Sequence, residues 1–199
     1  MGILKKLTEE YFGDTVREED FIDIHDLNVE IVSFTDNNDK FHKRGYKPED
    51  RDTLKELLER MIEVRGDEGN FNDIDTSDIK SMVSLFQFNS TFNGDITGWS
   101  VSKVIDMSGM FYCAKSFNQD ISKWEFPNLI NMSFMFSYAE SFNQPIGDWK
   151  FPNIISMNRM FYNATSFKQD LSKWDLKGKD KIEIFYGCPI KKEYKPKMK

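Results

Sequence analysis

The sequence predicts an α/β fold. We expect a solenoid of about four to five coils of 25 residues, each a short strand plus a short helical turn, capped by an N-terminal helix. Three observations favour it. Large apolar residues recur every 25 residues, a segment with helical periodicity precedes the first repeat, and strongly charged segments flank the repeats.

The repeat is defined by columns of residues that keep one interval. Six independent columns at one period cannot arise from composition alone, and a period of roughly 20–50 residues is typical of solenoids. In such folds each coil covers the apolar face of its neighbour. The columns are Trp99, Trp124, Trp149 and Trp174; Phe92, Phe117, Phe142 and Phe167; Met82, Met107, Met132 and Met157, then Ile182; Phe86, Phe111, Phe136 and Phe161, ending at Tyr186; Ile96, Ile121, Ile146 and Leu171; and Met110, Met135 and Met160.

Each element of the repeat follows from local patterns. The stretches DITGWSV and DISKWEF roughly alternate apolar and polar residues, which predicts a short strand. In NMSFMF the spacing of Met132, Met135 and Phe136 places all three on one face of a helical or 3₁₀ turn. Ala114, Ala139 and Ala164 stand where the chain must bend back tightly.

The segment before the repeats predicts the capping helix. In EDRDTLKELLERMIEVRG one apolar stripe carries leucine, methionine and isoleucine, Asp50 or Asp52 can cap its start, and Gly66 can end it. Four regions follow: a small acidic element at 1–46 with a strand at NVEIVSF and a polar loop after it, the capping helix at 47–70, the solenoid at 71–190, and a basic tail at 191–199.

The sequence predicts structural roles for the repeated apolar, amide and aspartate side chains. Stacking directs the Met, Phe and Trp columns inward, so they form the core. Columns of Asn93, Asn118 and Asn143 and of Gln119, Gln144 and Gln169 predict amides hydrogen-bonded from coil to coil. Asp95, Asp120 and Asp170, with Pro145 in the third coil, indicate a strand-edge or turn role. Outward positions such as Lys103, Glu125 and Lys150 vary.

Charge and cysteine usage bound the functional class. The net charge is −6, with −8 over residues 1–70, −3 over 71–175 and +5 over 176–199, which disfavours a general nucleic-acid surface. No signal peptide, lipobox or apolar span is apparent, so we expect a cytoplasmic protein, with a phage particle or the cell surface as the alternative. Cys113 and Cys188 lie 75 residues apart, hence in one column about 14 Å apart, too far for a disulfide.

The sequence offers little for catalysis. Its two histidines, His25 and His42, have no partner at metal-ligand spacing. The loop DNNDK begins like a calcium loop, but Lys40 replaces an acidic ligand. We therefore predict no catalytic residues, no cofactor-binding residues and no metal ligands.

The phrases NDIDTSDIKSMVSLF, FNGDITGWSVSKVIDMSGMF and FNQDISKW resemble the BspA-like leucine-rich-repeat surface-protein family, whose 25-residue repeat also occurs in mycoplasmal lipoproteins of unknown function. The resemblance covers roughly residues 47–190. It implies a leucine-rich-repeat-like solenoid and, from the best-known members, adhesins that bind host proteins. It brings no catalytic residues.

Three functions are compatible with these features. The leading hypothesis is a non-catalytic protein–protein interaction module that presents its repeat surface to a protein partner, related to phage or host interaction. The second is an exported adhesin that binds host proteins. The third is an enzyme that uses the N-terminal segment, with His25 or His42 as general base.

Overall fold

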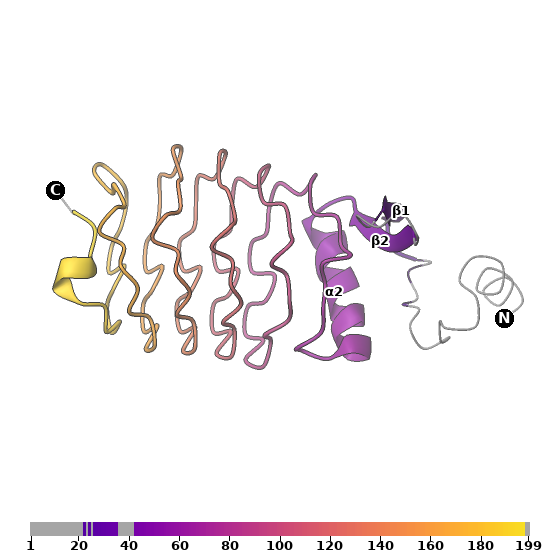
Figure 1. Ribbon diagram of the computed structural model, residues 1–199, viewed down its shortest axis with the longest axis horizontal. Helices are drawn as coiled ribbons and strands as arrows, with labels where there is room; N and C mark the ends of the chain where they lie inside the picture. Colours follow the sequence, from indigo (N-terminus) through magenta and orange to yellow (C-terminus); the bar gives the residue numbers. More distant parts are fainter. Residues whose placement is uncertain (1–21, 23, 25, 36–41, 198–199) are drawn as a thin grey trace, which may run out of the picture.

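The computed structural model describes residues 22, 24, 26–35 and 42–197. It is elongated: a β-hairpin and a helix lie at the N-terminal end, and stacked coils run from them to the C-terminal end (Figure 1). Strands β1 (Val29–Thr35) and β2 (His42–Pro48) pair antiparallel, with Val29 opposite Pro48. Helix α2 spans Arg51–Arg65 and the 3₁₀ helix η3 spans Lys192–Tyr194.

The hairpin differs in part from its prediction. NVEIVSF forms all but the last residue of β1, as expected, but the stretch expected to be a polar loop contains β2. This stretch forms a strand because it is hydrogen-bonded to β1 along its length. Strand β2 is also hydrogen-bonded to the first coil. Tyr46 forms a parallel bridge with Ile74, and its N–H donates to Asp73 O at 2.9 Å. His25, the loop DNNDK and the segment ILKKLTEEYF, whose sequence predicts a short helix, lie outside the described residues.

Helix α2 is delimited by its caps and covers the first coil. The Asp50 carboxylate accepts hydrogen bonds from the N–H groups of Asp52 (3.0 Å) and Thr53 (2.9 Å), so Asp50 is the N-cap. Gly66, with φ of 76°, ends the helix and donates to Ile62 O. The buried stripe joins the same core as the coils and consists of Leu54, Leu57, Leu58 and Met61.

Backbone hydrogen bonds join each coil to the next. The N–H groups of Met107, Gly109, Phe111 and Cys113 donate to carbonyls 24 positions further on, at 2.9–3.0 Å. The same pattern recurs at the other interfaces between residues 82 and 186, with an offset of 23 positions at the last of them. A parallel bridge precedes each of these sets, in the column Ser81, Asp106, Asn131, Ser156 and Asp180.

The local elements of the coil are turns. At DISKWEF the Asp120 carboxylate accepts from Ser122 N–H (3.0 Å) and Trp124 N–H donates to Ile121 O (3.1 Å), so the chain turns where a strand was expected. At NMSFMF, Met135 N–H donates to Met132 O, but Phe134 has φ of 60°. A helical turn requires negative φ, so this is a β-turn.

The core contains the predicted columns. Stacked phenylalanines run through it, with ring centroids 5.5 Å apart for Phe86–Phe111 and for Phe111–Phe136. The tryptophan column lies at the core edge, where the indole N–H of Trp99, Trp149 and Trp174 donates to a carbonyl of the preceding coil at 2.9–3.3 Å. The Met, Phe and Trp residues of these columns are all buried.

The last coil is one residue shorter than predicted. Ser156 bridges Asp180, 24 positions on, because the turn at Gly178, with φ of 70°, reaches the bridge one residue sooner. Phe185 therefore stacks on Phe161, and the columns ending at Ile182 and Tyr186 were aligned wrongly. For the same reason Cys113 and Cys188 do not share a column; both are free thiols.

Candidate functional site

A groove along the coils is the candidate functional site. It has a volume of about 600 Å³ and crosses four successive coils. Three isoleucines form its floor, one from each of three coils. Its lining residues are Lys80, Lys103, Ile105, Asn128, Ile130, Asn153 and Ile155.

Local alternation of side chains explains why isoleucines face solvent here. Before each parallel bridge the chain is extended, so neighbouring side chains point to opposite faces. Val104, Leu129 and Ile154 are fully buried, whereas the residue that follows each points outward. The outward residues Ile105, Ile130 and Ile155 are 46%, 41% and 62% exposed.

The backbone beneath the isoleucines is fully committed to the stack. Ile105 N–H donates to Lys80 O (2.8 Å), Ile130 N–H to Ile105 O (2.9 Å) and Ile155 N–H to Ile130 O (2.8 Å). The amides beside them are also engaged, since Asn128 Nδ2 donates to Ser102 O and Asn153 Nδ2 to Pro127 O. The groove therefore presents apolar surface with few spare donors.

Positive charge lies at one end of the groove. Lys80 occupies the isoleucine column one coil earlier and makes no ion pair with any described residue. Lys103 lies 2.5 Å from Asp78, which also pairs with Lys47 at 2.7 Å. Hydrogen bonds from Lys103 and Lys47 lower the pKa of Asp78 to about 2, so it is ionised near neutral pH. Among the described residues, no carboxylate lines the groove.

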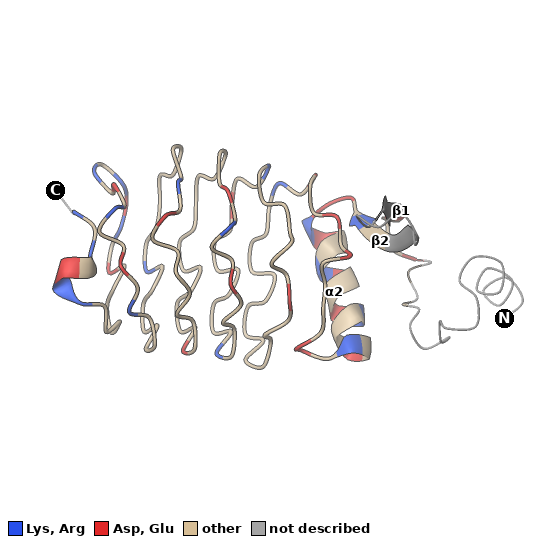
Figure 2. Cartoon of the chain, in the orientation of Figure 1, with Lys and Arg blue, Asp and Glu red and all other residues tan. Residues whose placement is uncertain are grey.

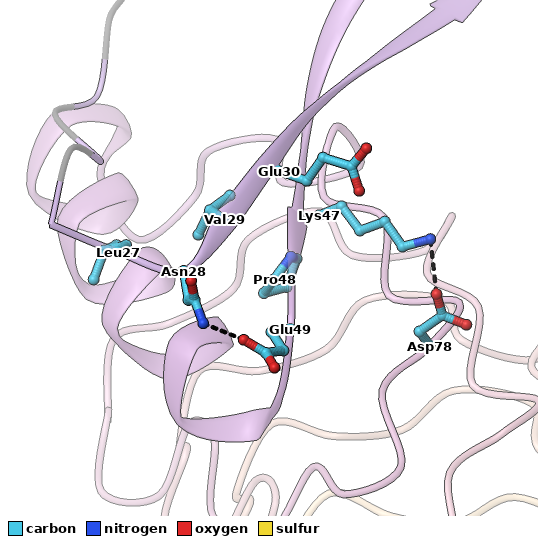
Figure 3. A pocket seen from close by; sticks show the side chains of 8 residues that line it. All are labelled: Leu27, Asn28, Val29, Glu30, Lys47, Pro48, Glu49 and Asp78. Atoms are coloured by element: carbon cyan, nitrogen blue, oxygen red, sulfur yellow. Dashed lines mark hydrogen bonds and ion pairs between the residues drawn. The ribbon is translucent and has the colours of Figure 1, made fainter.

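A second cavity, of about 510 Å³, lies where the hairpin meets the first coil (Figure 3). Four of its polar side chains are directed at one another: Lys47 reaches Asp78, and the Asn28 amide donates to the Glu49 carboxylate. These four groups already have partners, which leaves the Glu30 carboxylate as the charged lining group that is not bonded to another lining residue.

The structure also places the residues singled out from sequence. Asn118 N–H donates to Asn93 Oδ1 (2.9 Å) and Gln119 Nε2 to Asn93 O (2.7 Å), which confirms the predicted bonding of amides from coil to coil. The next coils repeat it. The carboxylates of Asp95, Asp120 and Asp170 each accept from the N–H two residues on, which confirms their turn role. His42 begins β2, and Lys103 lines the groove.

Sequence reasoning missed the isoleucine column. Its signal was present: VID, LIN and IIS each place two β-branched or aliphatic residues side by side, where only one can face the core. Because the strand was assigned to DISKWEF, this extended stretch was not recognised and its second apolar residue was overlooked.

Other features bear on chemistry. Burial raises the pKa of the Cys188 thiol and that of Cys113, which keeps both thiols protonated near neutral pH. Within the described residues, no three His, Cys, Asp or Glu side chains are grouped to hold a metal ion, and no helix is long and apolar enough to cross a membrane. Charged residues are dense along α2 and sparser along the middle coils (Figure 2).

Comparison with known proteins identifies a family. The family model described as "Mycoplasma protein of unknown function, DUF285" matches residues 53–174. No curated protein and no solved structure matches significantly. The matched stretch contains most of α2, the Trp and Phe columns and all three groove isoleucines, and it covers more than half of the chain. The chain therefore belongs to the DUF285 family.

Proposed function

We propose that this protein is a non-catalytic interaction module, built as a leucine-rich-repeat-like solenoid, that binds a protein partner through the isoleucine groove. One observation carries the proposal: three isoleucines from successive coils are exposed in one groove and add little to a core that is complete without them. Contiguous exposed apolar surface of this kind marks interaction sites.

The solenoid assignment rests on the stacking. Bonds between coils recur with the sequence period, and each coil has its large side chains between those of its neighbours. The resemblance to BspA-like repeats, which is finer than the DUF285 match, points to the same class. Repeat proteins of this class commonly use a continuous surface across several coils for binding.

The non-catalytic assignment rests on the chemistry of the described residues. The groove lining comprises lysine, asparagine and isoleucine, without an acid–base pair. The two thiols have raised pKa values, the reverse of what a nucleophilic cysteine needs.

A matched pair of substitutions tests the proposal. Ile155 and Ile182 are both 62% exposed, but only Ile155 lines the groove. Tagged wild type, Ile155→Asp and Ile182→Asp proteins would be used for affinity capture from cells of the source organism and any host, with quantitative mass spectrometry. We expect one or more proteins to be captured by wild type and Ile182→Asp and lost with Ile155→Asp. Equal capture by all three proteins would contradict the groove as the binding site.

A further inference from the structure

We propose that the partner presents an amphipathic α-helix to the groove, with three apolar side chains on one seam and carboxylates near the end that lies over Lys80. This inference rests on the proposed function and names the chemistry of the partner. It follows from three properties of the groove: its closed backbone, the spacing of its isoleucines and the position of its unpaired charge.

The closed backbone excludes a partner that adds as a strand. Strand addition requires free N–H and C=O groups along an edge. Here the N–H groups of Ile105, Ile130 and Ile155 all donate within the stack, and the carbonyls of Lys80, Ile105 and Ile130 accept them. A partner must therefore satisfy its own backbone internally, as a helix does.

The spacing of the isoleucines fits a helix that lies along the stack. Hydrogen-bonded coils are separated by about 4.8 Å, so the three isoleucines span about 9.6 Å. Helix positions i, i+3 or i+4, and i+7 rise by about 4.5 to 6 Å and then about 10.5 Å, which is close to this spacing. Same-face residues of an extended strand are about 6.6 Å apart and lose register after one coil.

The charge defines one end of the partner. Lys80 lines the groove and has no ion pair with any described residue, whereas Lys103 is paired with Asp78. With no carboxylate in the lining, an acidic group on the partner would meet Lys80 without like-charge repulsion. Nucleic acid fits poorly, because three isoleucines occupy the centre of the groove and the whole chain carries a net charge of −6.

Selection from a displayed library of random peptides about 16 residues long tests this inference with the full chain. Bound peptides would be counter-selected against Ile130→Asp, a half-exposed position where folding should persist. Circular dichroism would verify that Ile130→Asp unfolds at the same temperature as the wild type. If Ile130→Asp unfolds at a lower temperature, Ile155→Ser would be used in its place. We expect enriched peptides with apolar residues at i, i+3 or i+4, and i+7 and with Asp or Glu near one end. Their affinity for Ile130→Asp should fall at least tenfold.

A charge reversal completes the test. Against Lys80→Glu, the acidic preference should change to Lys or Arg at the same end of the peptide, while the apolar seam persists. Peptides with alternating apolar residues that still depend on Ile130 would overturn the helix and leave the groove as a binding site. Peptides that bind independently of Ile130 would overturn the proposed function as well. A chain that dimerises through Ile130 in sedimentation and selects no peptide would show a second copy in the groove, and the helical partner would be wrong.

Discussion

At the scale of the residue, the tryptophan column contains one member that differs from the rest. The indole N–H of Trp149 donates to Ile121 O at 3.2 Å, while Trp124 Nε1 is buried without a hydrogen-bond partner among the described residues. Both side chains are equally buried and both contact Phe126. Trp149 and Trp124 therefore allow a hydrogen-bonded buried N–H group to be compared with one that has no partner among the described residues.

We expect Trp124→Phe to be less destabilising than Trp149→Phe, by about 2 kcal/mol in the free energy of unfolding. Both changes remove similar apolar volume. The first also removes an unsatisfied N–H, whereas the second breaks a hydrogen bond and leaves Ile121 O with its bond from Trp124 N–H alone. Urea denaturation of the two variants and the wild type measures the difference. Equal losses would mean that the Trp124 indole has a partner, such as ordered water.

At the scale of the element, prediction from the sequence succeeded for the stacked columns and failed for the turns between them. The buried columns and the Asn ladder were predictable because they depend on period alone. The turns were not, because left-handed residues such as Phe134 and Tyr138 carry no glycine signal, although Gly109 occupies the equivalent position one coil before Phe134. The exposed isoleucines were hidden by the same error, since the extended stretch could be located only once the turns were known.

The Asp turns give the coils a pH dependence. The hydroxyl and N–H of Ser122 hold the pKa of Asp120 below its usual value, and Ser172 does the same for Asp170. A carboxyl whose pKa is depressed in the folded state stabilises the fold above its unfolded pKa, and this contribution is lost as the pH falls through the folded value. The loss therefore begins below about pH 4.

We expect the double variant Asp120→Asn and Asp170→Asn to lose less thermal stability than wild type between pH 5 and pH 3, on the order of one degree less, because both carboxylates are exposed and solvent screens them. Asparagine keeps the turn, as Asn131 already does by accepting from Ser133 N–H at 3.0 Å, but it does not titrate. Circular dichroism melts at the two pH values measure it.

The control is Glu56→Gln with Glu125→Gln, which removes the same charge from exposed side chains without a hydrogen bond to any described residue. If the control and the Asp variant change acid sensitivity equally, net charge rather than the turns is responsible.

At the scale of the whole molecule, the 25-residue coil is the structural unit, and the last coil shows that the fold tolerates the absence of one residue. One residue is absent there, yet Phe185 still stacks on Phe161 at 5.7 Å, because the shortening falls in an exposed turn and the Met160 and Phe161 columns resume after it at buried Ile184 and Phe185. The sequence alone could not locate this deletion, since aromatic Tyr186 lies one position beyond Phe185 and satisfies the 25-residue period equally well.

Removal of one whole coil should therefore preserve the fold. Deletion of residues 118–142 joins Phe117 to Asn143 and keeps every column in register. Stability of a repeat array is approximately a sum over repeats and their interfaces, so we expect cooperative unfolding at a lower temperature.

Deletion of residues 118–138 removes fewer residues but shifts the apolar columns out of alignment. We expect it to abolish cooperative unfolding, as followed by tryptophan fluorescence and circular dichroism. The shorter groove of the first deletion, with Ile105 beside Ile155, should also bind its selected peptides more weakly. If the first deletion unfolds as completely as the second, the 25-residue coil is not an independent unit of this molecule.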